Sequence, residues 1–331
     1  MRISGRLAAS TVAAGLVAVM ILAAGPAARA ASPGSTTSTK SLMGTKRNTG
    51  TASTSRVSTK SVASPSSTAS AKASGPAGVR AHWAELANEV TGQNLWSRSS
   101  VTERPMGSIT KVMTAYVVIE AGDLSQVITV PRGIIGYDNT YDASTAGLVP
   151  GQKLTALQLL YALLLPSGCD AAYTLAYAYG HGHPAQFITK MNAMARKLGL
   201  TKTHFTDFSG LPDPTEYSTY STARDLVTLG RDAMRLAVFR RVVGTRTFRL
   251  AANREHRAYV WSNLNPLLGH FAGATGIKTG FTAVAGDCLL FAANRKGREL
   301  IGVVLDSSSS PSGLSAAASD ATTMLDWGFG R

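Results

Sequence analysis

A serine and a lysine three positions apart, Ser108 and Lys111, form the first pair whose residue types could support catalysis. Residues three apart share one face of a helix, so the hydroxyl and the amine would lie side by side. A serine hydroxyl is a weak nucleophile until a base removes its proton. A neutral lysine can be that base when burial and a nearby positive charge lower its pKa. The pair therefore predicts a lysine-activated nucleophilic serine, and Lys278 is the candidate for the nearby charge.

The segment around Lys278 contains groups that could hold a substrate. Residues 276–282 are typical of a strand, and they include Lys278-Thr279-Gly280. Glycine in an edge strand lets another backbone approach, so a peptide could pair along this edge. Lys278 and Thr279 would then face a terminal carboxylate. An acyl-transfer intermediate also needs oxyanion donors, and the backbone N–H groups of Ser108 and Phe281 are the candidates.

Hydrophobic spacing and turn residues predict the elements that position these groups. Thr155 and Asp170 are expected to cap two of the helices, and Pro166 is expected to end the first of those two. Hairpins are expected over residues 81–97 and around the turn at residues 295–297. The expected helices cover residues 108–121, 156–165, 171–179, 187–198, 223–236 and 316–327, and the expected strands cover 276–282, 288–293 and 300–305.

The order of these elements predicts an α+β fold. A strand hairpin is followed by many helices, then by strands, then by a final helix. We expect an antiparallel sheet flanked by helices, with a helical lobe inserted into it. Cys169 and Cys288 are too few to form a disulfide framework, and we expect them to be unpaired, although an exported chain would permit pairing.

The N-terminal quarter of the chain is expected to lie outside this domain. Residues 1–30 combine a basic start, an apolar stretch and an Ala-Arg-Ala end, which is typical of a signal peptide, or of an anchor if it is retained. Residues 31–77 are rich in Ser and Thr and basic, and they predict a disordered tether. The folded domain is expected over residues 78–331. Much of the net charge of +14 therefore lies outside the folded domain, which argues against nucleic-acid binding. The tether could make a weak contact with anionic wall polymer or membrane.

The motifs closely resemble those of the low-molecular-mass penicillin-binding proteins, the D-alanyl-D-alanine carboxypeptidases of serine peptidase family S11. This resemblance implies a β-lactamase/transpeptidase-like fold. It extends beyond the motifs, from about residue 80 to residue 329. The matching segments are Gly107–Ala115, Leu165–Ala172, Met191-Asn192, Leu198–Leu200, Phe208–Leu211, Ser221–Asp225 and Gly276–Thr282.

The resemblance implies roles for these residues. Ser108 would be acylated by the penultimate D-Ala carbonyl, with Lys111 as base. Ser167 would relay a proton between Lys111 and the leaving amine. Lys278 and Thr279, followed by Gly280 and Phe281, would bind the substrate. Water would release the acyl-enzyme, so the reaction trims the terminal D-Ala from peptidoglycan pentapeptide stems. β-Lactams would acylate Ser108 as substrate mimics. Neither a metal nor a cofactor is implied, and the protein would work outside the bacterial cytoplasm.

One residue departs from the family pattern. Cys169 stands where the family's second motif has asparagine, which can donate to a substrate carbonyl and accept from the lysine, whereas a thiol does both weakly. Three alternatives therefore stay open. The first is a non-catalytic protein that binds muropeptides or β-lactams. The second is a β-lactamase, although no E-x-x-L-N pattern surrounds Glu216. The third is a transpeptidase, which uses an amine as the acceptor.

Overall fold

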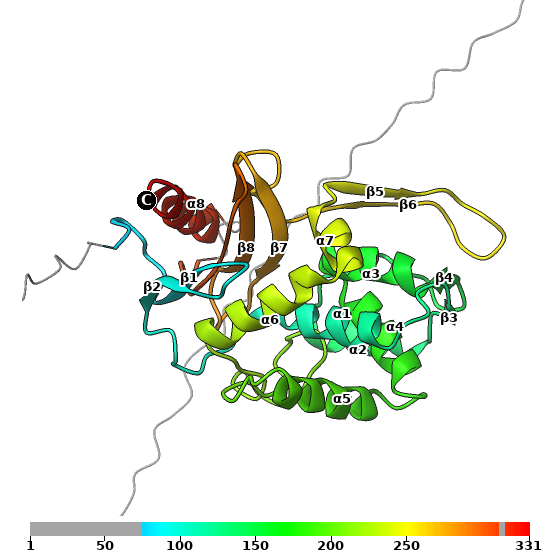
Figure 1. The fold of residues 1–331 in the computed structure, drawn as a ribbon. Coiled ribbons are helices and arrows are strands. Elements are labelled where there is room, and N and C mark those ends of the chain that lie inside the picture. Colours follow the sequence, from blue (N-terminus) through cyan, green and yellow to red (C-terminus); the bar gives the residue numbers. More distant parts are fainter. Residues whose placement is uncertain (1–74, 311–314) are drawn as a thin grey trace, which may run out of the picture. The chain divides into compact units, whose positions relative to one another are not determined.

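The structure is a computed structural model that describes residues 75–310 and 315–331. The expected signal peptide, residues 1–30, and residues 31–74 of the expected tether lie outside the described residues. The described part contains a five-stranded antiparallel sheet and helices on both of its faces (Figure 1). The α+β fold that the sequence predicts is confirmed. No helix in the described part is long and apolar enough to cross a membrane.

The sheet has the strand order β2-β1-β9-β8-β7, so that β7 lies at one edge. The expected N-terminal hairpin is confirmed as β1 and β2, and the expected C-terminal hairpin as β8 and β9, which pair in register from Leu289 opposite Val304 to Arg295 opposite Arg298. The bounds are Trp83–Asn88 for β1, Asn94–Arg98 for β2, Ala274–Gly280 for β7, Cys288–Arg295 for β8 and Arg298–Leu305 for β9.

Both faces of the sheet are buried, because successive strand residues alternate between two cores. Leu290 and Ile301 face the larger core, which the sheet shares with most of the helices, whereas Phe291 and Leu300 face the smaller one. Helix α8 (Ser315–Phe329) covers the smaller core and contacts β8 and β9. This double burial explains why β8 and β9 appear in the sequence as apolar runs instead of simple alternations.

The remaining helices lie on the other side of the sheet, where α6 and α7 contact it directly (Figure 1). The expected helical lobe is confirmed between β2 and β7 in the chain, and it also holds the short pairs β3–β4 and β5–β6. The bounds are α1 Lys111–Glu120, β3 Val127–Thr129, α2 Gly133–Tyr141, β4 Lys153–Thr155, α3 Ala156–Leu164, α4 Cys169–Tyr179, α5 Pro184–Lys197, α6 Ala223–Arg235, α7 Ala237–Gly244, β5 Thr247–Leu250 and β6 Tyr259–Ser262.

Three predictions about these elements need correction. The α-helix expected from Ser108 begins at Lys111, and a 3₁₀ turn, Gly107–Thr110, precedes it, as is common at helix N-termini. Asp170 is not the cap of α4. The cap is Gly168, and the Asp170 carboxylate accepts from the backbone N–H groups of Ala146 and Leu148 as well as of Ala171. The strand expected over 276–282 spans Ala274–Gly280.

Candidate active site

The 3₁₀ turn before α1 brings the hydroxyl and the amine together as the spacing predicted. Ser108 Oγ and Lys111 Nζ are 2.7 Å apart. The lysine side chain is 0% exposed, so it is not a surface lysine with its amine in solvent. Lys111 Nζ also donates to the carbonyl oxygen of Ser209, at 3.0 Å, and lies 3.3 Å from the sulfur of Cys169.

These three contacts suit a lysine that acts as a base. A neutral amine has two N–H groups and one lone pair. The Ser209 carbonyl can only accept, so it takes one N–H, and the Cys169 sulfur can take the other. In the protonated form Lys111 Nζ donates to Ser108 Oγ, whereas in the neutral form its lone pair would accept from the Ser108 hydroxyl. An ammonium ion, which has three N–H groups, would satisfy the same three partners after the proton has moved to the lysine.

The position of the Ser209 carbonyl depends on a buried carboxylate that the sequence analysis did not single out. Asp207 Oδ1 accepts hydrogen bonds from the backbone N–H groups of Ser209, Gly210 and Leu211. Its Oδ2 accepts from the Tyr137 hydroxyl at 2.6 Å, and burial raises the pKa of that tyrosine well above its usual value. Asp207 therefore fixes the turn that presents the Ser209 carbonyl to Lys111.

The second motif lies beside this pair, at the start of α4. Ser167 is buried and has a left-handed backbone conformation, with φ 65°. The Ser144 hydroxyl donates to the Ser167 carbonyl at 2.8 Å, and the Cys169 N–H donates to the Ser144 carbonyl at 2.8 Å. Within the described residues Ser167 Oγ has no hydrogen bond to Lys111. The position nearer to the amine is occupied by Cys169.

The end of β7 packs closely against the 3₁₀ turn. A Cβ atom on Gly280 would lie 2.5 Å from the Met106 carbonyl oxygen, and one on Gly107 would lie 2.8 Å from the Phe281 nitrogen. Glycine at both positions therefore permits the contact between the nucleophile turn and the strand. Strand β7 is an edge strand, as the sequence predicted, so its outer backbone edge is not paired to another strand of the sheet.

Lys278 and Thr279 take different positions on this strand. Lys278 is 1% exposed, and its Nζ donates to the carbonyl oxygen of Thr279 at 3.0 Å and to its hydroxyl at 3.4 Å. Burial, followed by the charge of Lys111, lowers the pKa of Lys278 well below its usual value. Thr279 lines the pocket described next, whereas the lysine lies behind it.

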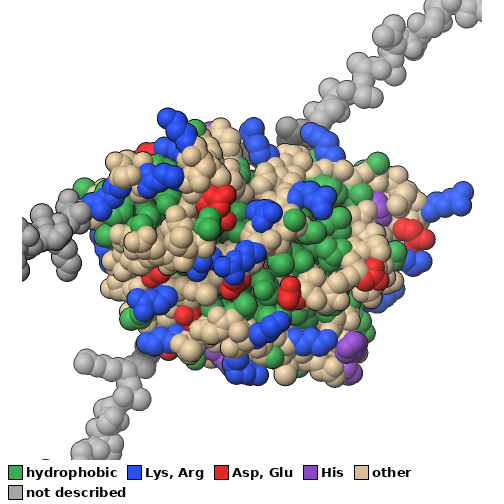
Figure 2. Space-filling model, viewed as in Figure 1, with side chains coloured by type: hydrophobic (Ala, Val, Ile, Leu, Met, Phe, Trp, Pro, Cys, Tyr) green, Lys and Arg blue, Asp and Glu red, His purple; other side chains and the backbone are tan. Residues whose placement is uncertain are grey.

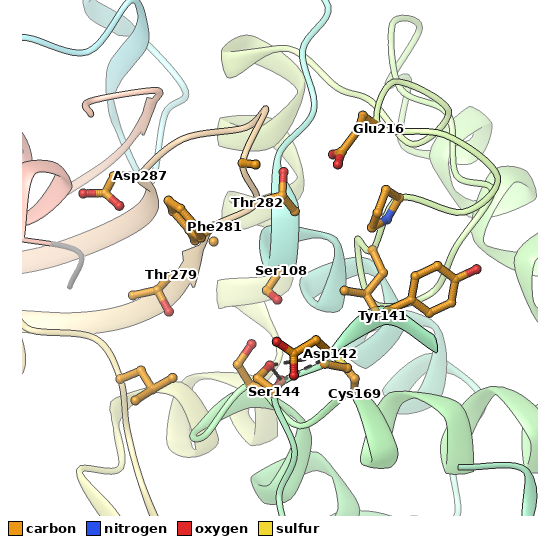
Figure 3. A pocket seen from close by; sticks show the side chains of 17 residues that line it. Ser108, Tyr141, Asp142, Ser144, Cys169, Glu216, Thr279, Phe281, Thr282 and Asp287 are labelled. Atoms are coloured by element: carbon orange, nitrogen blue, oxygen red, sulfur yellow. Dashed lines mark hydrogen bonds between the residues drawn. The ribbon is translucent and has the colours of Figure 1, made fainter. Parts of the chain in front are cut away.

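These groups meet in an open pocket of about 540 Å³. Figure 3 shows Ser108 near its centre, with Thr279 and Phe281 on one side and Ser144 and Cys169 on the other. Thr279 and Phe281 come from the end of β7 and the residue after it, whereas Cys169 comes from α4 in the helical lobe. The pocket therefore lies between the sheet and the lobe.

Three carboxyl groups that were not predicted as site residues also line this pocket: Asp142, Glu216 and Asp287. Both carboxyl oxygens of Asp287 are buried without a hydrogen-bond partner in the described part of the chain. Burial, followed by the charge of Asp306, raises its pKa. No sequence motif marks these residues, because they come from loops that only the fold brings to the pocket.

Comparison with known proteins decides the family. The profile of the family described as D-alanyl-D-alanine carboxypeptidase, peptidase S11, matches residues 68–309. The chain belongs to this family. Members of the family act on D-Ala-D-Ala stem peptides of the cell wall outside the cytoplasm, and they bind β-lactams. The resemblance stated from the motifs is confirmed.

Individual relatives cover most of the chain. It is 41% identical to a D-alanyl-D-alanine carboxypeptidase of Streptomyces sp. strain K15 over 73% of its length and 84% of the relative's. It is 35% identical to a D-alanyl-D-alanine carboxypeptidase of Mycobacterium tuberculosis over 77% of its length and 84% of the relative's. A serine-to-alanine variant of the Streptomyces K15 DD-transpeptidase superposes with a TM-score of 0.72 at 39% identity, over 76% of this chain and 99% of that one.

The K15 structures bear on Cys169. They include the variant in which one serine is replaced by alanine, and variants in which a cysteine two positions later is replaced by asparagine or by alanine. Ser167 and Cys169 have the same spacing. A cysteine at this distance from a serine is therefore also found in a relative named as a DD-transpeptidase.

Proposed function

We propose that this chain is an active serine D-Ala-D-Ala carboxypeptidase in which Ser108 is the nucleophile and Lys111 is the base. The observation that supports this most directly is the 2.7 Å approach of Ser108 Oγ to the buried Lys111 Nζ, at a pocket beside a free strand edge. A substrate peptide that pairs with the edge of β7 would bring its penultimate D-Ala carbonyl to Ser108.

The reaction then follows in two steps. Ser108 Oγ bonds to the carbonyl carbon as its proton moves to Lys111, and the developing oxyanion accepts from the N–H groups of Ser108 and Phe281. The Lys111 proton then reaches the leaving D-Ala amine, with Ser167 as the relay. Water attacks the ester in the second step and regenerates the Ser108 hydroxyl.

The substrate carboxylate would bind at Thr279. The hydroxyl of Thr279 lines the pocket and can donate to the carboxylate, while Lys278 Nζ, 3.4 Å behind that hydroxyl, supplies positive charge, because a bound carboxylate favours the protonated amine. Gly280 and Phe281 present the backbone edge, and the Cys169 thiol takes the place of an amide donor. Trimming in the wall requires export, for which we assign residues 1–30 as the signal peptide and residues 31–77 as the tether.

The acceptor is water in a carboxypeptidase and an amine in a transpeptidase. The Streptomyces K15 relatives are named with both activities. Incubation with a pentapeptide that ends in D-Ala-D-Ala, with and without glycine as an added amine, separates the two. Free tetrapeptide alone supports hydrolysis, and a glycine-extended product supports transfer.

The test of the nucleophile is the intact mass of the purified chain after excess benzylpenicillin is added, with Ser108→Ala as the control. We expect a lasting adduct of one penicillin on the wild type and none on the control. No adduct, with the penicillin left intact, would favour a non-catalytic binding protein. Rapid hydrolysis of penicillin without an adduct would favour a β-lactamase, with Glu216 on the pocket wall as the first candidate for its base.

A further inference from the structure

A second, smaller hollow of about 220 Å³ lies at the base of the β5–β6 hairpin. Arg246, Thr247, Asn265 and His270 are among the residues that line it, and none of its lining residues is acidic. The hollow is therefore lined with hydrogen-bond donors and a positive charge, which suits an anion.

Asn265 is the feature that points to a ligand. It is 3% exposed, and its side-chain oxygen accepts from the backbone N–H of Leu267 at 3.0 Å, which fixes the orientation of the amide. The amide nitrogen, Nδ2, is buried and has no hydrogen-bond partner in the part of the chain that the structure describes. An unsatisfied buried donor is costly, so it calls for a partner from outside the chain, such as a water or an ion.

Arg246 brings the charge to this hollow. Its side chain makes no ion pair and no hydrogen bond within residues 75–310 and 315–331. The guanidinium passes over Gly269, where a Cβ atom would lie 2.8 Å from its central carbon. Glycine at this position, which has a φ of 83°, leaves room for the arginine at the rim of the hollow.

The hollow and the catalytic pocket share one wall. Leu264 lines the pocket, and its two neighbours, Asn263 and Asn265, line the hollow. The segment is held in place, because Leu264 N–H donates to the Leu165 carbonyl at 3.1 Å and Asn263 N–H donates to the Arg246 carbonyl at 2.8 Å. A polymer that enters the pocket would therefore pass close to the hollow.

The β5–β6 hairpin, whose base forms the hollow, is positively charged. Residues 246–257 hold four arginines and one glutamate, a net charge of +3. Nine of the 33 Lys and Arg and none of the 19 Asp and Glu precede residue 75, so the described part as a whole has a net charge of only +5. Figure 2 shows basic side chains at the edge of the molecule where the β5–β6 hairpin lies. Residues 246–257 therefore have a net charge of +3, against a net charge of +5 for the whole described part.

We propose that this hollow is an anion subsite that binds a carboxylate of a neighbouring peptide stem in the wall polymer whose stem occupies the catalytic pocket. This rests on the proposed function, because each uncleaved stem then ends in a D-Ala carboxylate. The Arg246 guanidinium pairs with the carboxylate through two parallel N–H groups, and Asn265, whose buried Nδ2 lacks a partner among the described residues, lies in the wall beside it. The subsite holds the polymer while one stem is trimmed.

The test is co-sedimentation with insoluble peptidoglycan from which phosphate-containing polymers have been removed. All proteins carry Ser108→Ala, so that no stem is cleaved during the measurement and the result does not depend on catalysis. We expect Arg246→Gln to raise the Kd about tenfold, because a charge-assisted hydrogen bond is lost. Asn265→Asp, which keeps the acceptor for Leu267 and replaces the donor with a repelling oxygen, is expected to weaken binding at least as much.

Arg241→Gln is the matched control, because Arg241 is an exposed arginine on α7 that does not line the hollow. Equal weakening by Arg241→Gln and Arg246→Gln, or none by either, would overturn the subsite. An effect of Arg246 only on peptidoglycan that retains its phosphate polymers would overturn the carboxylate and identify phosphate as the anion. Benzylpenicillin acylation of the variants with Ser108 intact reports separately on the proposed function, and we expect it to match that of the wild type.

Discussion

The two motif lysines are both buried, yet they differ in what surrounds them. Lys111 Nζ has three hydrogen-bond partners from three different segments, which together direct it at Ser108. Within the described residues Lys278 Nζ donates only to the adjacent Thr279, and burial lowers its pKa well below the usual value. A buried amine with so few hydrogen-bond partners costs stability, so we expect Lys278 to serve substrate binding and not folding.

Replacement of Lys278 by methionine tests whether Lys278 serves substrate binding and not the stability of the fold. Met has a straight side chain of similar length and no charge to bury, so the Tm at pH 7 is expected to equal or exceed that of the wild type. The second-order rate of benzylpenicillin acylation is expected to fall about 10- to 100-fold, because the carboxylate of the drug loses a charged partner. Lys296→Met, at an exposed turn, is the control. Unchanged acylation would remove Lys278 from substrate binding, and a large loss of Tm would show that its charge stabilises the fold.

Sequence spacing was sufficient to predict which residues lie close together within one helical turn or along one strand. Ser108 and Lys111 are neighbours on the chain, and so are Lys278 and Thr279, so their proximity could be predicted. The contact of Lys111 with Ser209 joins residues 98 positions apart, and it depends on a turn that Asp207 holds. No local pattern records such a contact, so the sequence predicts Lys111 as the candidate base but not the groups that orient its amine.

At the scale of elements, the site depends on the approach of β7 to the 3₁₀ turn before α1. The turn and the strand belong to different ends of the domain sequence, and the contact between them puts the Phe281 N–H beside the nucleophile turn. Only glycine at positions 107 and 280 permits this contact, because a Cβ atom at either position would overlap backbone of the other element. Backbone clashes of this kind cannot be relieved by a change of rotamer.

Gly280→Ala should therefore separate the two elements without unfolding the domain. The added Cβ would lie 2.5 Å from the Met106 carbonyl, so the strand and the turn must move apart. A displacement of about 1 Å of reacting groups can cost about 100-fold, and we expect benzylpenicillin acylation to slow by about that factor. Gly136→Ala on α2, where a Cβ atom meets nothing within 4 Å, is the control and should acylate at the wild-type rate. Equal rates for the two variants would show that the contact does not position the site.

The elements that sequence patterns missed have physical features in common. Helix α2 buries only Ile134, so it has no apolar stripe, and it begins with glycine. Strands β5 and β6 are four residues long, and no glycine or proline marks the loop between them. The β5–β6 pair is stabilised by tertiary packing, including the stack of Phe248 on Tyr161 of α3 at 3.9 Å between ring centroids. Local sequence periodicity cannot predict an element whose stability depends on packing against a distant part of the chain.

At the scale of the whole molecule, burial raises the pKa of several carboxyl groups, so the stability of the fold depends on pH. Glu89, which follows β1, is the clearest, because burial and then the charge of Glu299 raise its pKa from 4.5 to about 7. The folded state therefore holds this proton more tightly than the unfolded chain does. As pH rises from about 4.5 to about 7, the unfolded state loses its proton first, so this group lowers the free energy of unfolding across that window.

Glu89→Gln removes this titration while it keeps the shape of the side chain. The variant and the wild type should have similar Tm values near pH 4, where the carboxyl is protonated in both states. The variant should become progressively more stable than the wild type up to about pH 7, and the difference should level off above it. Thermal unfolding at intervals from pH 4 to pH 9 measures this, with the exposed Glu103→Gln as the control. A difference that shrinks as pH rises would mean that the folded protein stabilises the charged form of Glu89, and the account of its burial would then be wrong.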